Sequence, residues 1–338
     1  WTAVREAKEE TGIQKPYPLT GAILSLDILP VKAHQKKGVP VPAHQHYNVT
    51  YGIIADQKET LRIQPDENTA VQWIPVEQLP EICKEPHMLP VYEKVIHRMR
   101  CWKAMQEQAL LQTAQPLLAW YPLHARDLPW RHTQEPYRIW LSEIMLQQTR
   151  VEAVKNYYAR FLETFPDIAA LAAAEQDQVN KCWEGLGYYS RAANLRKAAQ
   201  TIQEQYGGVF PRTWEEVRGL AGVGDYTAGA VCSICYGLPT PAVDGNVLRV
   251  AARVMNHFCE IDRPEQKAAV TALLRQVYLD NPEHCGTLTQ AFMEIGATVC
   301  VPNGQPHCEA CPLSELCLGR QYCDALRLPQ RTAKKARR

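Results

Sequence analysis

The chain has almost no net charge and no long apolar run, and both absences narrow its function. Its 37 lysines and arginines nearly balance 36 acidic residues, for a formal charge of +1. The chain as a whole is therefore not attracted to polyanions, so any nucleic-acid binding depends on local patches. Without a run of 18 apolar residues we expect no transmembrane helix and no membrane partner. The first residues, Trp1 to Glu6, have no signal-peptide pattern, so we expect a cytoplasmic protein.

Cysteine, by contrast, is plentiful, with 12 residues in the chain. Without a secretory signal we expect thiols that bind metal and not disulfides. Near the C-terminus four lie close together: Cys300, Cys308, Cys311 and Cys317. Zinc sites usually have two C-x2-C pairs, whereas here one such pair is flanked by single cysteines. This spacing favours a [4Fe–4S] cluster, with zinc and unliganded thiols as the open alternatives.

The two halves of the chain differ in their apolar patterns. In residues 1–98, apolar runs between turns predict strands at 22–29, 47–54 and 70–74, and helices at 2–11 and 91–100. This half is expected to be α/β or α+β. From Met105 onward, apolar residues recur every three or four positions. This pattern predicts an all-α domain with helices at 136–148, 151–163, 175–183, 190–206, 226–236, 246–257, 264–279 and 286–299.

Glu143 is the first candidate catalytic residue. Pro136 can begin a helix in which residue 143 shares a face with Ile139, Trp140 and Leu146. A carboxyl group on that face is poorly hydrated, which raises its pKa and suits it to donate a proton near neutral pH. The alternative is an exposed or salt-bridged glutamate.

Asp244 precedes the helix predicted at 246–257. It has the character of an N-cap that accepts hydrogen bonds from the first turn. A carboxylate kept ionised by those amides could also face a developing cation. The two roles are compatible.

Two glycine-containing turns are candidate contacts for nucleic acid. Gly222 and Gly224 join two predicted helices and could place backbone amides around a phosphate, or could form an ordinary turn. Tyr188 lies in the run from Gly185 to Arg191, where aromatic rings could stack on bases and the arginine could contact phosphate, or the rings could pack inside.

Together these runs resemble the helix–hairpin–helix DNA glycosylases, and most of all the MutY-type adenine DNA glycosylases. The resemblance covers about residues 105 to 325, and it implies a helix–hairpin–helix domain closed by a [4Fe–4S] loop. The first two cysteines are one residue further apart than is usual in the family, an insertion that Asn303-Gly304 can absorb as a turn. The matching runs are LPWR (128–131), WLSEIMLQQTRV (140–151), GLGYYSR (185–191), GVGDYTAGA (222–230), VDGNV (243–247) and 292–317.

The resemblance also implies a reaction. Lyases of the related endonuclease III branch carry a lysine where this chain has Tyr226, so we expect a glycosylase that does not cut the strand. Its substrate would be adenine mispaired with 8-oxoguanine or guanine in double-stranded DNA, rotated out of the helix. Glu143 would protonate the base and Asp244 would stabilise the oxocarbenium ion, with Tyr226 and Asn246 near the sugar.

The remaining contacts are carried over from the same family positions. Arg131 and Gln290 would touch the edge of the adenine, and Gln148 and Tyr188 would probe the duplex beside 8-oxoguanine. Backbone amides around Gly222 and Gly224 would hold the DNA backbone. We expect the protein to act as a monomer at the bacterial nucleoid.

The N-terminal half carries a second resemblance. Residues 5–13, REAKEETGI, match the second half of a Nudix box. Glu6, Glu9 and Glu10 share one helical face, where they could hold Mg²⁺ or form a solvated acidic surface. The first part of the box would precede Trp1, so we expect an incomplete α/β Nudix-like domain and doubt its hydrolase activity.

The expected organisation is therefore multidomain. It comprises a partial Nudix-like domain (1–98), a linker or helix (99–115), the glycosylase domain (116–299), the iron–sulfur loop (300–323) and a basic tail (324–338). Two other functions stay open: a Nudix-type nucleotide pyrophosphatase with an attached DNA-binding module, and a non-catalytic iron–sulfur DNA-binding protein.

Overall fold

The structure is a computed structural model that describes residues 2–36, 38–65, 70–322 and 324–332. The chain divides into two compact units. Unit 1 comprises residues 1–109, 251–266 and 316–338, and unit 2 comprises 110–250 and 267–315. The cations of the expected basic tail, Lys334 to Arg338, lie outside the described residues.

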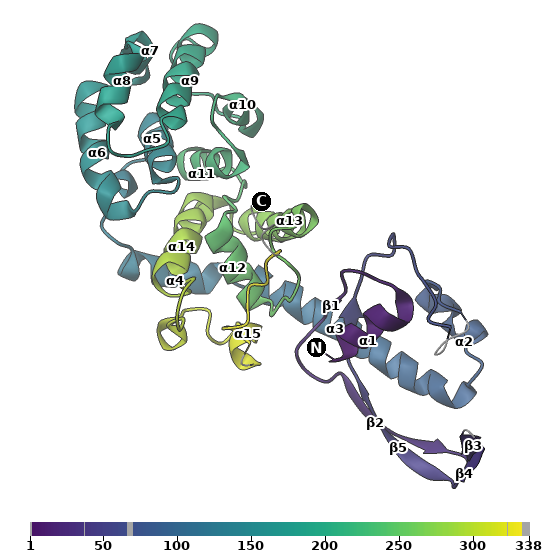
Figure 1. The fold of residues 1–338 in the computed structure, drawn as a ribbon. Coiled ribbons are helices and arrows are strands. Elements are labelled where there is room, and N and C mark those ends of the chain that lie inside the picture. Colours follow the sequence, from purple (N-terminus) through teal and green to yellow (C-terminus); the bar gives the residue numbers. More distant parts are fainter. Residues whose placement is uncertain (1, 37, 66–69, 323, 333–338) are drawn as a thin grey trace. The chain divides into compact units, whose positions relative to one another are not determined.

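The helices and strands are named as in Figure 1. The α-helices are α1 (Thr2–Thr11), α2 (Leu79–Ile82), α3 (Leu89–Leu111), α4 (Ala114–His124), α5 (Pro136–Leu146), α6 (Val151–Thr164), α7 (Ile168–Ala173), α8 (Gln176–Trp183), α9 (Ser190–Tyr206), α10 (Trp214–Gly219), α11 (Asp225–Tyr236), α12 (Gly245–Val254), α13 (Pro264–Leu279), α14 (Cys285–Thr298) and α15 (Leu318–Gln321). The strands are β1 (Tyr17–Pro18), β2 (Ser25–Val31), β3 (His34–Lys36), β4 (Val39–Val41), β5 (His44–Thr50) and β6 (Ile53–Ile54). Short 3₁₀ helices include η3 (Pro129–Arg131) and η5 (Cys308–Ala310).

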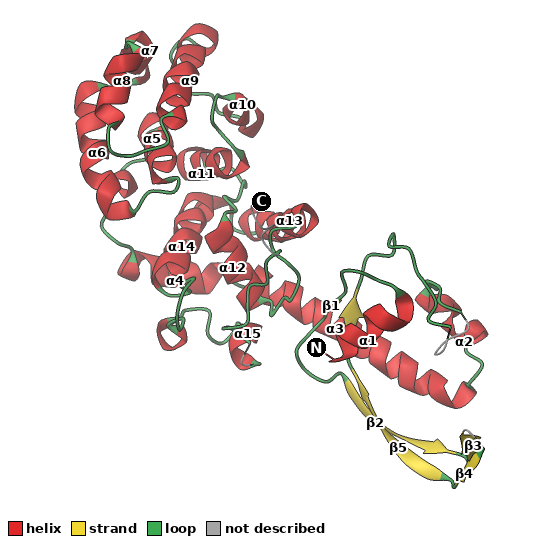
Figure 2. Ribbon diagram, viewed as in Figure 1, coloured by secondary structure: helices red, strands yellow, loops and turns green. Residues whose placement is uncertain are grey.

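Unit 2 is built of helices joined by loops, as predicted (Figure 2). Helix α5 packs against α6, α9 and α11, and α14 packs against α4 and α11. Large side chains such as Trp140, Phe161 and Trp183 are fully buried in its core. Burial of this apolar surface, at about 25 cal/mol per Å², is the main force that holds α5 in place.

All eight helices predicted for this half are present, and α9 and α13 have the predicted bounds. Three helices of unit 2 were not predicted: α4, α7 and α10. Helices α7 and α10 have only six residues each, too few to show a helical period. Instead, side chains begin them: Asp167 accepts a hydrogen bond from the Ala170 amide at 2.8 Å, and Thr213 forms a capping box with Glu216.

Unit 1 contains α1 and an antiparallel pair, β2 and β5, that continues into the shorter pair β3 and β4 (Figure 1). The register of β2 and β5 pairs Ser25 with Thr50 and Val31 with His44. A small core forms where Leu19 and Leu24 pack on Trp102 of α3, whose indole N–H donates to the Leu19 carbonyl at 3.2 Å.

The strand predicted at 70–74 was wrong, because these residues have no regular secondary structure. Trp73 in this segment is half-exposed, and the described part of the chain pairs no strand with it. An apolar run forms a strand only when a neighbour satisfies its backbone groups. Among the described residues, no helix has both the length and the apolar character required to cross a bilayer.

Candidate active site

Unit 2 encloses a cavity of about 260 Å³ whose wall includes six of the predicted site residues. They come from five separate parts of the chain: Arg131 (η3), Glu143 (α5), Tyr226 (α11), Asp244 and Asn246 (start of α12) and Gln290 (α14). The fold therefore brings the proposed acid and the proposed counter-anion to the same cavity.

Glu143 is the buried acid of this cavity. Helix α5 begins at Pro136, where the Glu135 carboxylate accepts hydrogen bonds from the Tyr137 and Arg138 amides. Glu143 is 5% exposed, and its Oε2 atom has no hydrogen-bond partner among the described residues.

The environment of Glu143 raises the pKa of its carboxyl group to about 7. Burial is the largest cause, and the negative charge of Asp244 adds to it. A hydrogen bond with Tyr226 and the positive charge of Arg131 act in the opposite direction. The direction of this pKa shift agrees with the prediction from the sequence, and it favours the protonated carboxyl group at a higher pH than in an exposed glutamate.

Asp244 is held in a fixed orientation by the start of α12. Its Oδ1 atom accepts hydrogen bonds from the backbone amides of Asn246 and Val247 at 2.8 and 2.9 Å. Its Oδ2 atom accepts a hydrogen bond from the Asn246 side chain at 2.7 Å. Asp244 is thus an N-cap that also lines the cavity, so both roles proposed from the sequence are compatible with its position.

Arg249, which was not predicted as a site residue, orients Asn246 through a hydrogen bond to its side chain. Its guanidinium group donates to the Asn246 side-chain oxygen at 3.0 Å, to the Gly296 carbonyl at 2.7 Å and to the Cys300 carbonyl at 2.8 Å. Arg249 is 3% exposed, so these hydrogen bonds lie in a medium of low dielectric constant. The orientation of Asp244 therefore depends on a buried arginine.

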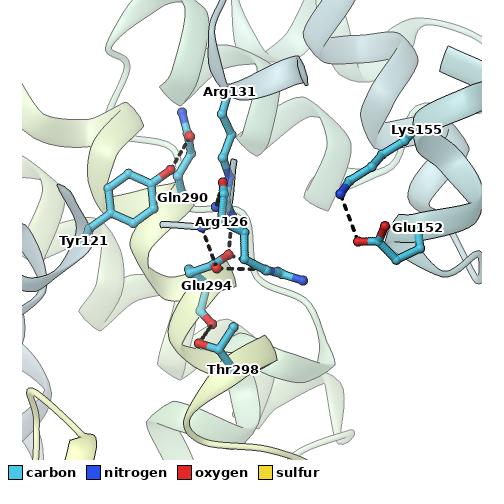
Figure 3. Close-up of polar contacts among 8 residues, drawn as sticks. All are labelled: Tyr121, Arg126, Arg131, Glu152, Lys155, Gln290, Glu294 and Thr298. Atoms are coloured by element: carbon cyan, nitrogen blue, oxygen red, sulfur yellow. Dashed lines mark hydrogen bonds and ion pairs between the residues drawn. The ribbon is translucent and has the colours of Figure 1, made fainter. Parts of the chain in front are cut away.

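A buried carboxylate, Glu294, holds two arginines that line the cavity, Arg126 and Arg131 (Figure 3). It accepts hydrogen bonds from the Arg126 side chain at 2.8 and 3.0 Å, from the Arg126 backbone amide at 3.1 Å, and from Arg131. Burial alone would raise the pKa of Glu294, but the hydrogen bonds from Arg126 and Arg131 outweigh it and lower the pKa. The ionised carboxylate fixes the direction of the Arg131 guanidinium group.

Gln290 is fixed in a similar way. The hydroxyl of Tyr121 on α4 donates to the Gln290 side-chain oxygen at 2.6 Å, and Arg131 lies over the Tyr121 ring at 5.5 Å (Figure 3). Sequence reasoning missed Tyr121, Arg126 and Glu294. The available signal was that Glu294 follows Gln290 by four residues on α14 and therefore lies on the same helical face.

Gly222 and Gly224 lie outside the wall of this cavity, in the turn before α11. Gly222 has φ +74°, and a Cβ atom there would lie 2.7 Å from the Cβ of Asn194, so the turn requires glycine. Gly224 has φ −99° and open space where a Cβ would be. Of these two glycines, only Gly222 therefore has a left-handed backbone and a close approach to a neighbour.

Gln148 and Tyr188 lie in two loops with left-handed backbone, at φ +58° and +50°. Buried Arg191 ties these loops together, because it donates to the carbonyls of Gln147 and Gly187 at 2.6 and 3.1 Å. Arg191 is buried and both of its terminal nitrogens donate to internal oxygens, so the structure favours the packed alternative for this arginine over a contact with phosphate. Tyr188 remains 63% exposed and available to a partner.

The four clustered cysteines form no disulfide. Cys308 and Cys311 flank the turn of η5, where the Cys311 amide donates to the Cys308 carbonyl at 3.3 Å. Four thiols are a suitable donor set for an iron–sulfur cluster. Within the described ranges, however, no three His, Cys, Asp or Glu side chains are arranged to hold a metal ion. The cluster therefore stays a prediction.

Glu6, Glu9 and Glu10 are all exposed on α1. Arg5 lies 3.9 Å from Glu9, a distance at which an exposed ion pair contributes little stability. In the part of the chain that the structure describes, the three carboxylates do not form a metal-binding group. Mg²⁺ binding at these residues also stays a prediction.

Comparisons with known proteins show which families the two parts of the chain resemble. Residues 141–276 match the HhH-GPD superfamily of base excision DNA repair proteins, and residues 2–98 match the NUDIX domain. The adenine DNA glycosylase of Homo sapiens is 44% identical over 214 residues, which are 61% of this chain and 39% of that protein. The adenine DNA glycosylase of Buchnera aphidicola subsp. Baizongia pistaciae (strain Bp) is 36% identical over 60% of this chain and 57% of that protein.

The chain thus spans about two fifths to three fifths of the length of these relatives. A solved structure of a thermostable thymine-DNA glycosylase is 27% identical, with a TM-score of 0.57 over 64% of this chain and 98% of that one. The helical part of the chain therefore has the fold of the HhH-GPD base excision repair superfamily, and it follows a NUDIX domain in the sequence.

Proposed function

We propose that this protein is a DNA glycosylase that removes adenine mispaired with 8-oxoguanine or guanine in double-stranded DNA. The observation that carries the proposal is that Glu143, with a pKa raised to about 7, shares one cavity with an oriented carboxylate, Asp244. The similarity to adenine DNA glycosylases supports the choice of base.

The reaction begins with proton transfer from Glu143 to N7 of an adenine that has left the base stack. The protonated base leaves with the electron pair of the C1′–N9 bond, so the sugar develops oxocarbenium character. Asp244 faces this positive charge. Glu143, now ionised, accepts a proton from the water whose oxygen attacks C1′, and this step restores the acid.

We assign recognition to residues of the cavity wall and of the neighbouring loops. Arg131 and Gln290 contact the edge of the adenine, because Glu294 and Tyr121 fix their directions in the cavity wall. Gln148 and Tyr188 contact the duplex beside 8-oxoguanine, and amides around Gly222 and Gly224 hold the DNA backbone.

The product is an abasic site in an intact strand. Strand cleavage by this fold needs an amine that forms a Schiff base with the sugar, and Tyr226 in the cavity wall supplies no amine. Its hydroxyl, whose pKa burial raises well above 10, stays neutral beside Glu143.

We also propose that Cys300, Cys308, Cys311 and Cys317 hold a [4Fe–4S] cluster. Bound there, the cluster would stabilise a loop that faces DNA and would transfer no electrons in the excision reaction. Arg249 connects the Cys300 carbonyl to Asn246, so the loop and the cavity share a buried hydrogen-bond network.

The test is incubation of the full chain with a duplex that contains one A:8-oxoguanine pair. We expect adenine release, with strand scission only after hot alkali. Glu143→Gln should abolish release, whereas Glu152→Gln, which changes an exposed carboxylate of α6, should leave it unchanged. Scission without alkali, or full activity of Glu143→Gln, would overturn the proposal.

A further inference from the structure

Unit 1 contains a second cavity, of about 600 Å³, that the glycosylase reaction does not use. Its wall is formed by α1, by residues 14–18, and by the segments 258–263 and 330–331. Five cations line it: Arg5, Lys8, Lys15, Arg263 and Arg331. A single carboxylate, Glu260, is part of the same wall.

The charges that line this cavity do not balance, and Asp262, which interacts with Arg331, is not part of the wall. Glu260 forms an ion pair with Arg263, in which the Arg263 Nε atom lies 2.7 Å from Glu260 Oε2. Lys8 and Lys15 have no ion-pair partner among the residues described. Arg5 makes only the long, exposed contact with Glu9. Cations gathered in a concave wall produce a positive potential that attracts a compensating anion.

Buried apolar residues of the wall strengthen that potential. Val4, Pro16 and Phe258 line the cavity and are buried, so part of the field passes through apolar material and not through water. Arg5 and Lys8 lie three residues apart and share one face of α1. Glu6, Glu9 and Glu10 do not line the cavity, so it is separate from the predicted Mg²⁺ face.

We propose that this cavity binds a phosphate-bearing anion without transforming it. Phosphate oxygens suit lysine and arginine donors, which form charge-assisted hydrogen bonds about twice as strong as neutral ones. The phosphate comes from one of two sources: a free polyphosphate, or the backbone of a DNA duplex. The proposal is independent of adenine excision, which takes place in unit 2.

The first experiment measures binding of inorganic tripolyphosphate to the full chain by titration calorimetry. The cavity variant is the double substitution Lys8→Gln and Lys15→Gln, both at exposed positions. The matched control is Lys58→Gln and Lys84→Gln, two exposed lysines of unit 1 that do not line the cavity. Both variants change the net charge equally, and equal thermal unfolding curves verify that both fold.

The second experiment separates the two sources. Binding of a fully paired duplex is followed by fluorescence anisotropy across a salt series. If the cavity binds a free anion, the cavity variant should bind tripolyphosphate about tenfold more weakly than the control variant does. The two variants should then bind the duplex with equal affinity. If the cavity binds the DNA backbone, the cavity variant should show a shallower salt dependence than the control. The slope of log affinity against log salt concentration should be smaller in magnitude by about 2. Cavity and control variants that behave alike in both measurements would overturn the proposal.

Discussion

Substitution of Glu143 by glutamine should stabilise the protein in a pH-dependent way. The folded state raises the pKa of this carboxyl from 4.5 to about 7, so it binds more protons than the unfolded state between these two values. The free energy of unfolding contributed by Glu143 therefore falls as pH rises through this window. Above pH 7 the folded protein bears the full cost of keeping this buried carboxyl group ionised, which is about 3 kcal/mol for a pKa shift of this size.

Glutamine has nearly the same shape and does not ionise. Glu143→Gln should match the unsubstituted protein near pH 4.5 and exceed its stability by up to about 3 kcal/mol at pH 8.5. The assay is urea unfolding of the full chain at the two pH values, followed by tryptophan fluorescence, because tryptophans lie in the core of unit 2.

Glu294→Gln provides a control of opposite sign. The pKa of Glu294 is lowered in the folded state, so its stabilisation is present above its unfolded pKa and is lost as pH falls through its folded pKa. This variant should be destabilised at pH 8.5 and less so in acid. The same stability difference for Glu143→Gln at both pH values would refute the reasoning about burial.

Further predictions concern the other carboxylate, the turn before α11 and the buried arginine. Asp244→Asn should slow adenine release by about 10²-fold or more in single-turnover assays, with unchanged duplex affinity, because it removes the negative charge opposite the sugar. Gly222→Ala should lower the free energy of unfolding by about 1–3 kcal/mol, because it places a Cβ atom against Asn194 at positive φ. Gly224→Ala should lower it by less than ~1 kcal/mol, because that position has open space. Equal effects of the two substitutions in urea titrations would contradict the turn geometry. Arg249→Met should destabilise by about 1–3 kcal/mol in the same assay and slow excision, because it leaves buried acceptors unpaired; wild-type kinetics would disprove its positioning role.

The sequence was sufficient for most of the longer helices of unit 2, but it missed α4 and the short or unpaired segments. Residues 190–206 and 264–279 carry a clear helical period, and the structure has helices there with the same bounds. The six-residue helices α7 and α10 depend on capping side chains and show no such period. Residues 70–74 show that an apolar run does not specify a strand by itself, since none of the described strands pairs with it.

The candidate site was predicted in part because its residues match a family pattern. That resemblance linked Glu143 with Asp244, and the cavity confirms that they lie together. Nothing local in the sequence links Glu294 with Arg126 and Arg131, which precede it by more than 160 positions. Their contact depends on how η3 and α14 pack, which only the tertiary structure reveals.

The pH dependence of single-turnover adenine release from an A:8-oxoguanine duplex tests the central claim most directly. If Glu143 must be protonated to release the base, the rate should be constant at acidic pH and fall about tenfold per pH unit above about pH 7. A rate that is unchanged or increases from pH 6 to pH 9 would contradict the role of Glu143 as the acid.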